Sequence, residues 1–152
     1  MSKSKYGVLS LFLVLVFGAA FLLGSCTKTD DTKSAKKMIT EGVETMIEAR
    51  KLMVDQMILK DMIKEGPMME GDKKMKEGRE MLTDGQSMMD GENMMEGKQK
   101  IVEGANIMMD GWKMISDEMA KEGLPKKGMM ADGEKMITKG YKSIMDGSAM
   151  MK

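Results

Sequence analysis

The sequence lacks several residue types on which enzymes commonly depend. Its 152 residues include no histidine and one cysteine, Cys26. Histidine is the commonest general base near neutral pH, and the cysteine thiolate is a common nucleophile and metal ligand. The acidic residues are scattered among lysines, and no pair of them stands out from the rest. We therefore predict that this chain is not an enzyme.

Aromatic residues are also scarce, and the charge is balanced. All three phenylalanines and Tyr6 lie within the first 25 residues, which leaves Trp112 and Tyr141 for the rest of the chain. Two isolated aromatic side chains give no platform for stacking bases, so we expect them to fill the ends of a bundle. The 24 basic residues match 24 acidic residues, so no basic surface for nucleic acid is predicted.

The N-terminus has the order of a secretory signal peptide. Lys3 and Lys5 precede an apolar run over 8–23, and the small residues Gly24 and Ser25 follow. A basic start, an apolar centre and small residues before a cleavage site are typical of such peptides. The apolar run is shorter than the roughly 20 residues that a membrane-spanning helix needs. The alternative is an uncleaved anchor with an incidental cysteine.

The junction Leu23-Gly24-Ser25-Cys26 resembles the lipobox of bacterial lipoproteins, in which leucine and two small residues precede a cysteine. The resemblance implies that a signal peptide of residues 1–25 is removed after Ser25 and that Cys26 carries the lipid. It implies a lipid-anchored envelope protein, periplasmic or surface-facing. Thr27 replaces the aspartate of the best-known rule for inner-membrane retention, so the outer membrane is the expected location. With Cys26 acylated, no thiol is left for a disulfide or a metal.

The remaining chain divides into a short tether and one domain. Residues 26–33 are polar and show no apolar periodicity, which is typical of a flexible linker. Residues 34–152 are rich in methionine, with apolar residues three and four apart, as in amphipathic helices. Glu65-Gly66-Pro67 and Gly123-Leu124-Pro125 are helix stops.

The domain carries a degenerate heptad repeat, Gly-x-x-Met-(Met/Ile/Leu)-x-(Asp/Glu). Good copies begin at Gly78, Gly104, Gly133 and Gly147. Positions 0, +3, +4 and +7 share one face of a helix, so each glycine lies within the methionine stripe. An interior glycine weakens a helix by about 1 kcal/mol relative to alanine, and we infer that close approach of a neighbouring helix compensates. The alternative, a turn at every Asp-Gly or Glu-Gly, leaves segments too short for stable helices.

The repeat slips where Gly85, Gly91 and Gly97 are six residues apart. Six residues rotate the stripe by about 120°, and Asp90-Gly91-Glu92-Asn93 has turn chemistry, so we place a turn there. The predicted fold is an all-α antiparallel bundle of three to four amphipathic helices joined by short connections. The alternative keeps 68–122 as one long helix. The four expected segments are 34–64, 68–89, 94–122 and 128–150.

Methionine is the strongest compositional bias, with 24 copies. A methionine stripe is usually core, but leucine packs as well with better-defined rotamers. Thioethers are soft ligands for Cu(I) and, by the same softness, Ag(I), whereas the lack of histidine disfavours Cu(II) and zinc. The candidate ligands are Met53 and Met57, or the pairs Met88, Met89 and Met94, Met95 at the predicted turn.

The leading functional hypothesis is therefore an envelope lipoprotein that binds or buffers Cu(I) or Ag(I). One alternative is a structural or interaction lipoprotein with a malleable methionine core, which binds a helical partner or a second copy of itself. Another is a trap for oxidants, in which exposed methionines cycle to the sulfoxide and back.

Overall fold

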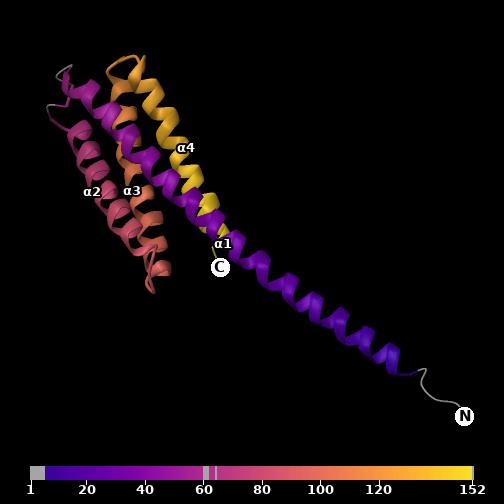
Figure 1. Ribbon diagram of the computed structural model, residues 1–152. Coiled ribbons are helices and arrows are strands. Elements are labelled where there is room, and N and C mark those ends of the chain that lie inside the picture. Colours follow the sequence, from indigo (N-terminus) through magenta and orange to yellow (C-terminus); the bar gives the residue numbers. More distant parts are fainter. Residues whose placement is uncertain (1–5, 60–61, 64, 152) are drawn as a thin grey trace, which may run out of the picture.

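The computed structural model describes the backbone of residues 6–59, 62–63 and 65–151, and the side chains from residue 30 onward except 58–61, 64 and 152. In this part the chain forms helices and no strand. The helices are α1 (Tyr6–Leu59), α2 (Pro67–Met88), α3 (Met94–Lys121) and α4 (Met129–Met150) (Figure 1). The prediction of an all-α bundle is confirmed. The ends of α2, α3 and α4 lie within one residue of those predicted.

Glycine sets several of the helix ends. Gly66 precedes α2 with a φ of +72°, Gly123 follows α3 with +67°, and Gly128 precedes α4 with +59°. These left-handed conformations suit glycine because a β-carbon is strained there. Between α2 and α3 the chain reverses over residues 89–93, as predicted. The alternative of a single helix over 68–122 is therefore wrong.

Helix α1 differs from the prediction at both ends. The sequence pattern predicts a start near residue 34, but the helix begins at Tyr6 and continues through the polar residues 26–33. This stretch includes neither glycine nor proline, so nothing in it stops a helix that is already formed. The first part of α1 projects well beyond the bundle (Figure 1). At the other end, α1 stops at Leu59, before the predicted residue 64.

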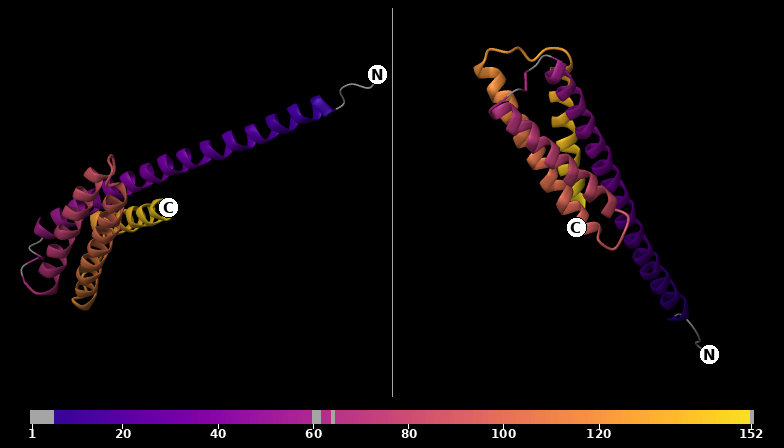
Figure 2. Two further views of the ribbon diagram at one scale, coloured as in Figure 1. Left: turned by 90° about the horizontal axis from the view of Figure 1, so that it is seen from below. Right: turned by 90° about the vertical axis from the view of Figure 1, so that its left-hand side faces the viewer.

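The helices form two antiparallel pairs. Helix α1 packs mainly against α4, and α2 packs mainly against α3, whereas contacts between the two pairs are fewer. Successive helices run in opposite directions (Figure 1), and the two pairs are inclined to each other (Figure 2). At one end of the bundle the α2–α3 turn lies beside α1, where Asp90 forms an ion pair with Lys36. We call this the proximal end, and the end with the other two connections the distal end.

Each pair is held along a line of small residues that we call the glycine seam. Its members are buried, recur every seven residues along each helix, and oppose one another across the pair. In α1 and α4 the opposed residues are Ala35 and Gly147, Gly42 and Gly140, and Ala49 and Gly133. In α2 and α3 they are Gly71 and Gly111, Gly78 and Gly104, and Gly85 and Gly97.

The seam brings the backbones of two helices into direct contact. A β-carbon at Gly78 would lie 2.5 Å from the carbonyl oxygen of Gly104, and one at Gly42 would lie 2.7 Å from that of Gly140. Ordinary contact of a β-carbon begins near 3.4 Å, so a larger residue would force the helices apart. The predicted compensation for the interior glycines, close approach within the methionine stripe, is confirmed. Close approach gains dispersion contacts along the whole pair.

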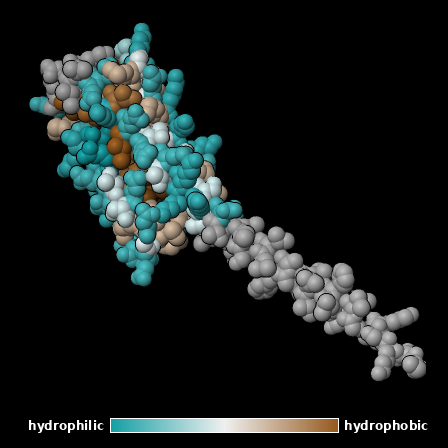
Figure 3. Space-filling model, in the orientation of Figure 1, coloured by the Kyte–Doolittle hydropathy of each residue, from teal (hydrophilic) through white to brown (hydrophobic). Residues whose placement is uncertain are grey.

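The residue four places after each seam residue fills the core beside the seam. All of these side chains are at most 4% exposed: Ile39, Met46, Met53, Met75, Leu82, Met89, Ile101, Met108, Ile115, Ile137, Ile144 and Met151. Hydrophilic residues cover most of the face shown in Figure 3, with a narrow band of hydrophobic atoms between them. The heptad pattern therefore accounts for both the seam and the core around it.

Candidate functional site

The methionines include a buried set in the core, a half-buried set along the helices and an exposed set at the helix ends. The most exposed are Met69, Met95, Met129 and Met150, at 54%, 49%, 42% and 40%. Each of them belongs to the first or last turn of its helix and follows or precedes a second methionine. The neighbours Met68, Met130 and Met151 are buried. Because adjacent residues of a helix diverge by about 100°, a Met-Met pair sends one side chain inward and the other outward.

Met53 and Met57, the first candidate pair for a soft metal, lie in the core. Their side chains are 1% and 0% exposed. A β-carbon at Gly133 would collide with Cγ of Met53 and would lie 3.1 Å from its sulfur. The thioether of Met53 therefore packs against the backbone of α4, which is the environment of a packing residue.

The second candidate set surrounds the turn at the proximal end. Met89 belongs to the core at 2% exposure, Met88 and Met94 are half-buried, and Met95 is exposed. Cβ of Met88 packs against Gly97, where an added β-carbon would lie 2.8 Å away. Three of these four methionines are thus at least partly exposed. The structure places this set near one end of the bundle and Met53 and Met57 toward the other, so the two sets do not meet.

A shallow groove of about 630 Å³ lies beside this turn, between α3 and α4. Its lining includes Met95 and Met145 together with Lys98 and Ser148. Nζ of Lys98 donates a hydrogen bond of 2.8 Å to the carbonyl oxygen of Met151, which places a cation at the C-terminus of α4, where the helix dipole favours it. Oγ of Ser148 is buried and has no hydrogen-bond partner within the described residues.

A buried ion pair links the two helix pairs, and sequence reasoning missed it. Nη2 of Arg50 in α1 donates a hydrogen bond of 2.6 Å to Oδ1 of Asp72 in α2, and both residues are 7% exposed. Nζ of Lys76 lies 3.0 Å from Oδ2 of Asp72. Scattered charges are usually solvated, so nothing in the composition predicted that these two would be buried. The available signal was their position, one residue after the seam residues Ala49 and Gly71.

The two aromatic residues behave differently from each other. Trp112 is 4% exposed, and Nζ of Lys126 lies 5.5 Å from the centre of its ring. The same amine forms an ion pair of 2.8 Å with Glu134, so a cation–π contact links Trp112 to the connection between α3 and α4. Trp112 lies nine residues before the end of α3 at Lys121 (121 − 112), so the prediction that it fills an end of the bundle is wrong. The prediction for Tyr141 is also wrong, because it lies in the middle of α4 and its hydroxyl donates a hydrogen bond of 2.9 Å to Asn106.

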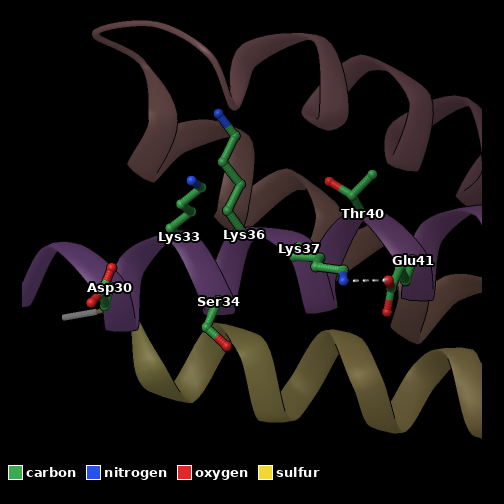
Figure 4. A pocket seen from close by; sticks show the side chains of 7 residues that line it. All are labelled: Asp30, Lys33, Ser34, Lys36, Lys37, Thr40 and Glu41. Carbon is green, nitrogen blue, oxygen red and sulfur yellow. Dashed lines mark ion pairs between the residues drawn. The ribbon is translucent and has the colours of Figure 1, made fainter.

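The proximal part of α1 carries a shallow depression of about 810 Å³, and all of its lining residues belong to that one helix (Figure 4). They are Asp30, Lys33, Ser34, Lys36, Lys37, Thr40 and Glu41. Three lysines lie between Asp30 and Glu41, and Nζ of Lys37 lies 3.7 Å from Glu41. A mixed face of a single helix is a solvated surface rather than a site for one ligand.

A smaller cleft of about 420 Å³ opens at the distal end. Its lining combines apolar and acidic side chains: Met62, Glu65, Pro67, Met68, Glu118, Glu122 and Leu124. Lys121 donates a hydrogen bond of 2.8 Å to Glu118, and this bond raises the pKa of the exposed Lys121 ammonium. Over the described residues, no three acidic, histidine or cysteine side chains are placed to hold a metal ion.

Ser25 and Cys26 lie in α1, where the structure describes the backbone but not the side chains. Where side chains are described, no helix has the length and apolar character needed to cross a bilayer. Comparisons with family models, curated proteins and solved structures give no match to this chain. Its function must therefore be argued from its own residues.

Proposed function

We propose that this chain is a lipid-anchored protein of the bacterial cell envelope whose bundle acts as a structural or interaction module and not as an enzyme. The anchor rests on the order of the first 25 residues and on the junction Leu23-Gly24-Ser25-Cys26. The outer membrane is the proposed location because Thr27 follows the cysteine. The polar surface and mixed charges of the bundle favour a domain that stands in water beside the membrane.

The main support for a structural or interaction role is the way in which methionine packs at the glycine seam. A β-carbon at Gly78 would lie 2.5 Å from Cγ of Met108, and one at Gly111 would lie 2.9 Å from Cγ of Met75. These side chains are fully buried, and each of them contacts the backbone of the opposite helix. The methionines at the seam therefore have a packing explanation that needs no ligand.

Substitution of the cysteine tests the anchor. With Cys26→Ala, we expect the unprocessed precursor to accumulate and the lipid-modified form to disappear, because no thiol is left to acylate. Thr27→Ala, next to it, serves as the control and should be processed normally. The measurement is gel mobility with labelled fatty acid. Normal processing and labelling of Cys26→Ala would contradict the proposal.

Soft-metal binding is the second candidate, and the exposure of methionines around the α2–α3 turn favours it. Met88, Met94 and Met95 are partly exposed methionines within eight residues of chain, next to the groove that contains Met145. Thioethers select Cu(I) and should accept Ag(I). They need no deprotonation, so binding there should be insensitive to pH.

An anaerobic titration with Cu(I) against a competing chelator tests this candidate. The sample is the soluble chain, which we define as residues 26–152 with Cys26→Ser. We expect a triple change to leucine at Met88, Met94 and Met95 to abolish binding. The control changes Met69 and Met129, which are also exposed but lie at the distal end. If the unmodified soluble chain does not bind even micromolar Cu(I), about −8 kcal/mol, this candidate is removed.

A further inference from the structure

In addition to the heptads, the chain contains a second repeat with a much longer period. Residues 35–89 match residues 97–151 at a constant offset of 62 positions (104 − 42 for the two glycines Gly42 and Gly104), and about a third of them are identical. The match extends beyond glycine and methionine into charged positions and connections. Such identical pairs include Lys51 and Lys113, Asp55 and Asp117, Lys64 and Lys126, Gly66 and Gly128, and Lys73 and Lys135. Each half is therefore one copy of a helical hairpin, α1–α2 or α3–α4.

The contacts of the structure obey the same offset. The seam contact between Gly42 and Gly140 becomes, when the first residue moves forward and the second back by 62, the contact between Gly104 and Gly78. The other two layers of the seam follow the same rule. The two halves are thus related as the subunits of a two-fold dimer, in which each surface is its own complement.

The contacts between the two hairpins are more extensive than the contacts between the two helices of one hairpin. Within a hairpin, α1 makes few contacts with α2, and α3 makes few with α4, whereas both seams run between the halves. A hairpin without its partner would leave both of its seam faces uncovered. In this structure the occupant of those faces is a repeat of the same sequence.

We propose that a second copy of this chain is a partner of the module, and that two chains associate by exchanging equivalent hairpins through the glycine seams. This inference rests on the proposed role as an interaction module. In the exchanged dimer, α2 of one chain packs on α3 of the other, and α1 of one chain packs on α4 of the other. Every seam contact of the single chain is kept, so the cost of exchange is confined to the turn at residues 89–93.

The geometry of that turn allows a sharp test. In a continuous helix each residue advances by 100°, so the 12 residues from Gly85 to Gly97 would place the two halves of the seam about 120° apart. A step of 11 residues would leave them only about 20° apart. Deleting Gly91 and changing Asp90, Glu92 and Asn93 to alanine should therefore join α2 to α3 with the seam on one face.

Light scattering and circular dichroism of the soluble chain provide the measurements. The deletion variant should double in mass and keep its helical content, because hairpins of two chains can pair along the joined helix. The matched control changes the same three residues and Gly91 to alanine without a deletion. Its seam halves point apart, so it should not form an equally stable dimer. A folded monomer from the deletion variant, or equally stable dimers from both variants, would overturn the proposal.

The unmodified soluble chain provides a second test if the deletion variant fails to fold. Two versions with different mass tags are unfolded together, mixed and refolded over a range of protein concentrations. Native mass spectrometry should show mixed dimers in a share that rises with concentration. The absence of mixed dimers at every concentration would overturn the proposed exchange of hairpins. It would not bear on the proposed lipid anchor, because the soluble chain carries no lipid.

Discussion

The glycine seam makes a prediction that is opposite in sign to helix propensity. In an isolated helix, Gly78→Ala would stabilise by about 1 kcal/mol. In this bundle the new carbon would lie 2.5 Å from both the carbonyl oxygen of Gly104 and Cγ of Met108. Ordinary contact begins near 3.4 Å, so 0.9 Å (3.4 − 2.5 Å) must be recovered by separating α2 from α3. The obstacle includes backbone, which cannot move aside as a side chain can.

The magnitude follows from these two opposed effects. Overpacking a core costs about 1–3 kcal/mol, and we expect the upper end here, so the net loss after the gain in propensity is about 2 kcal/mol. Urea unfolding of the soluble chain, followed by circular dichroism, measures it. Gly91→Ala is the control: no atom lies within 4 Å of the added carbon and its φ is not positive, so it should be neutral or stabilise by up to about 1 kcal/mol. If Gly78→Ala is as stable as the unmodified chain, the argument for a close seam fails.

Two further predictions concern the buried charges and the exposed sulfurs. Arg50→Met leaves Asp72 buried without its main partner and should cost about 3–5 kcal/mol, whereas adding Asp72→Leu should restore most of the loss, as measured by urea unfolding. A double variant no more stable than Arg50→Met would contradict this. Mild peroxide should oxidise Met69, Met95, Met129 and Met150 first, because they are the most exposed. Peptide mass spectrometry should find their sulfoxides while the helical content is still intact, and early oxidation of Met46 or Met108 would refute the burial argument.

The sequence predicts the helices well because their ends depend on local chemistry. Gly66, Gly123 and the turn at 90–93 act through backbone conformation, which neighbouring residues determine. The exception is α1, where residues 26–33 are polar but contain no residue that stops a helix. A polar composition predicts exposure and not the absence of a helix.

The pairing of the helices could not be read from the heptads alone. Every helix presents three small residues seven apart, so any two of them could form a seam. The offset of 62 residues between the halves does not select α1 with α4 and α2 with α3 either, because pairing within each hairpin would obey the same offset. The burial of Arg50 and Asp72 could not be predicted either, because it depends on how the two helix pairs are inclined to each other. The soft-metal candidates at Met53 and Met88 were proposed from composition, which does not distinguish a ligand from a packing residue.

The seam also favours methionine or isoleucine over leucine at the positions that face its glycines. At eight of the ten seam glycines, the nearest side-chain atom is Cγ of methionine or Cγ1 of isoleucine. Both atoms are methylene groups with a single onward branch. Leucine has a branched Cγ that carries two methyl groups, which do not fit a gap this narrow.

A pair of substitutions at Met108 tests this explanation. Met108→Leu keeps the hydrophobic character and nearly the volume, yet it should cost more than the roughly 1.5 kcal/mol that bounds most such exchanges. Met108→Ile should cost less, because Ile101 and Ile115 occupy the equivalent places one heptad away on the same helix. The comparison is made by urea unfolding of the soluble chain. If leucine is tolerated better than isoleucine, the shape of the γ-carbon does not account for methionine at these positions, and the soft-metal hypothesis regains its original argument.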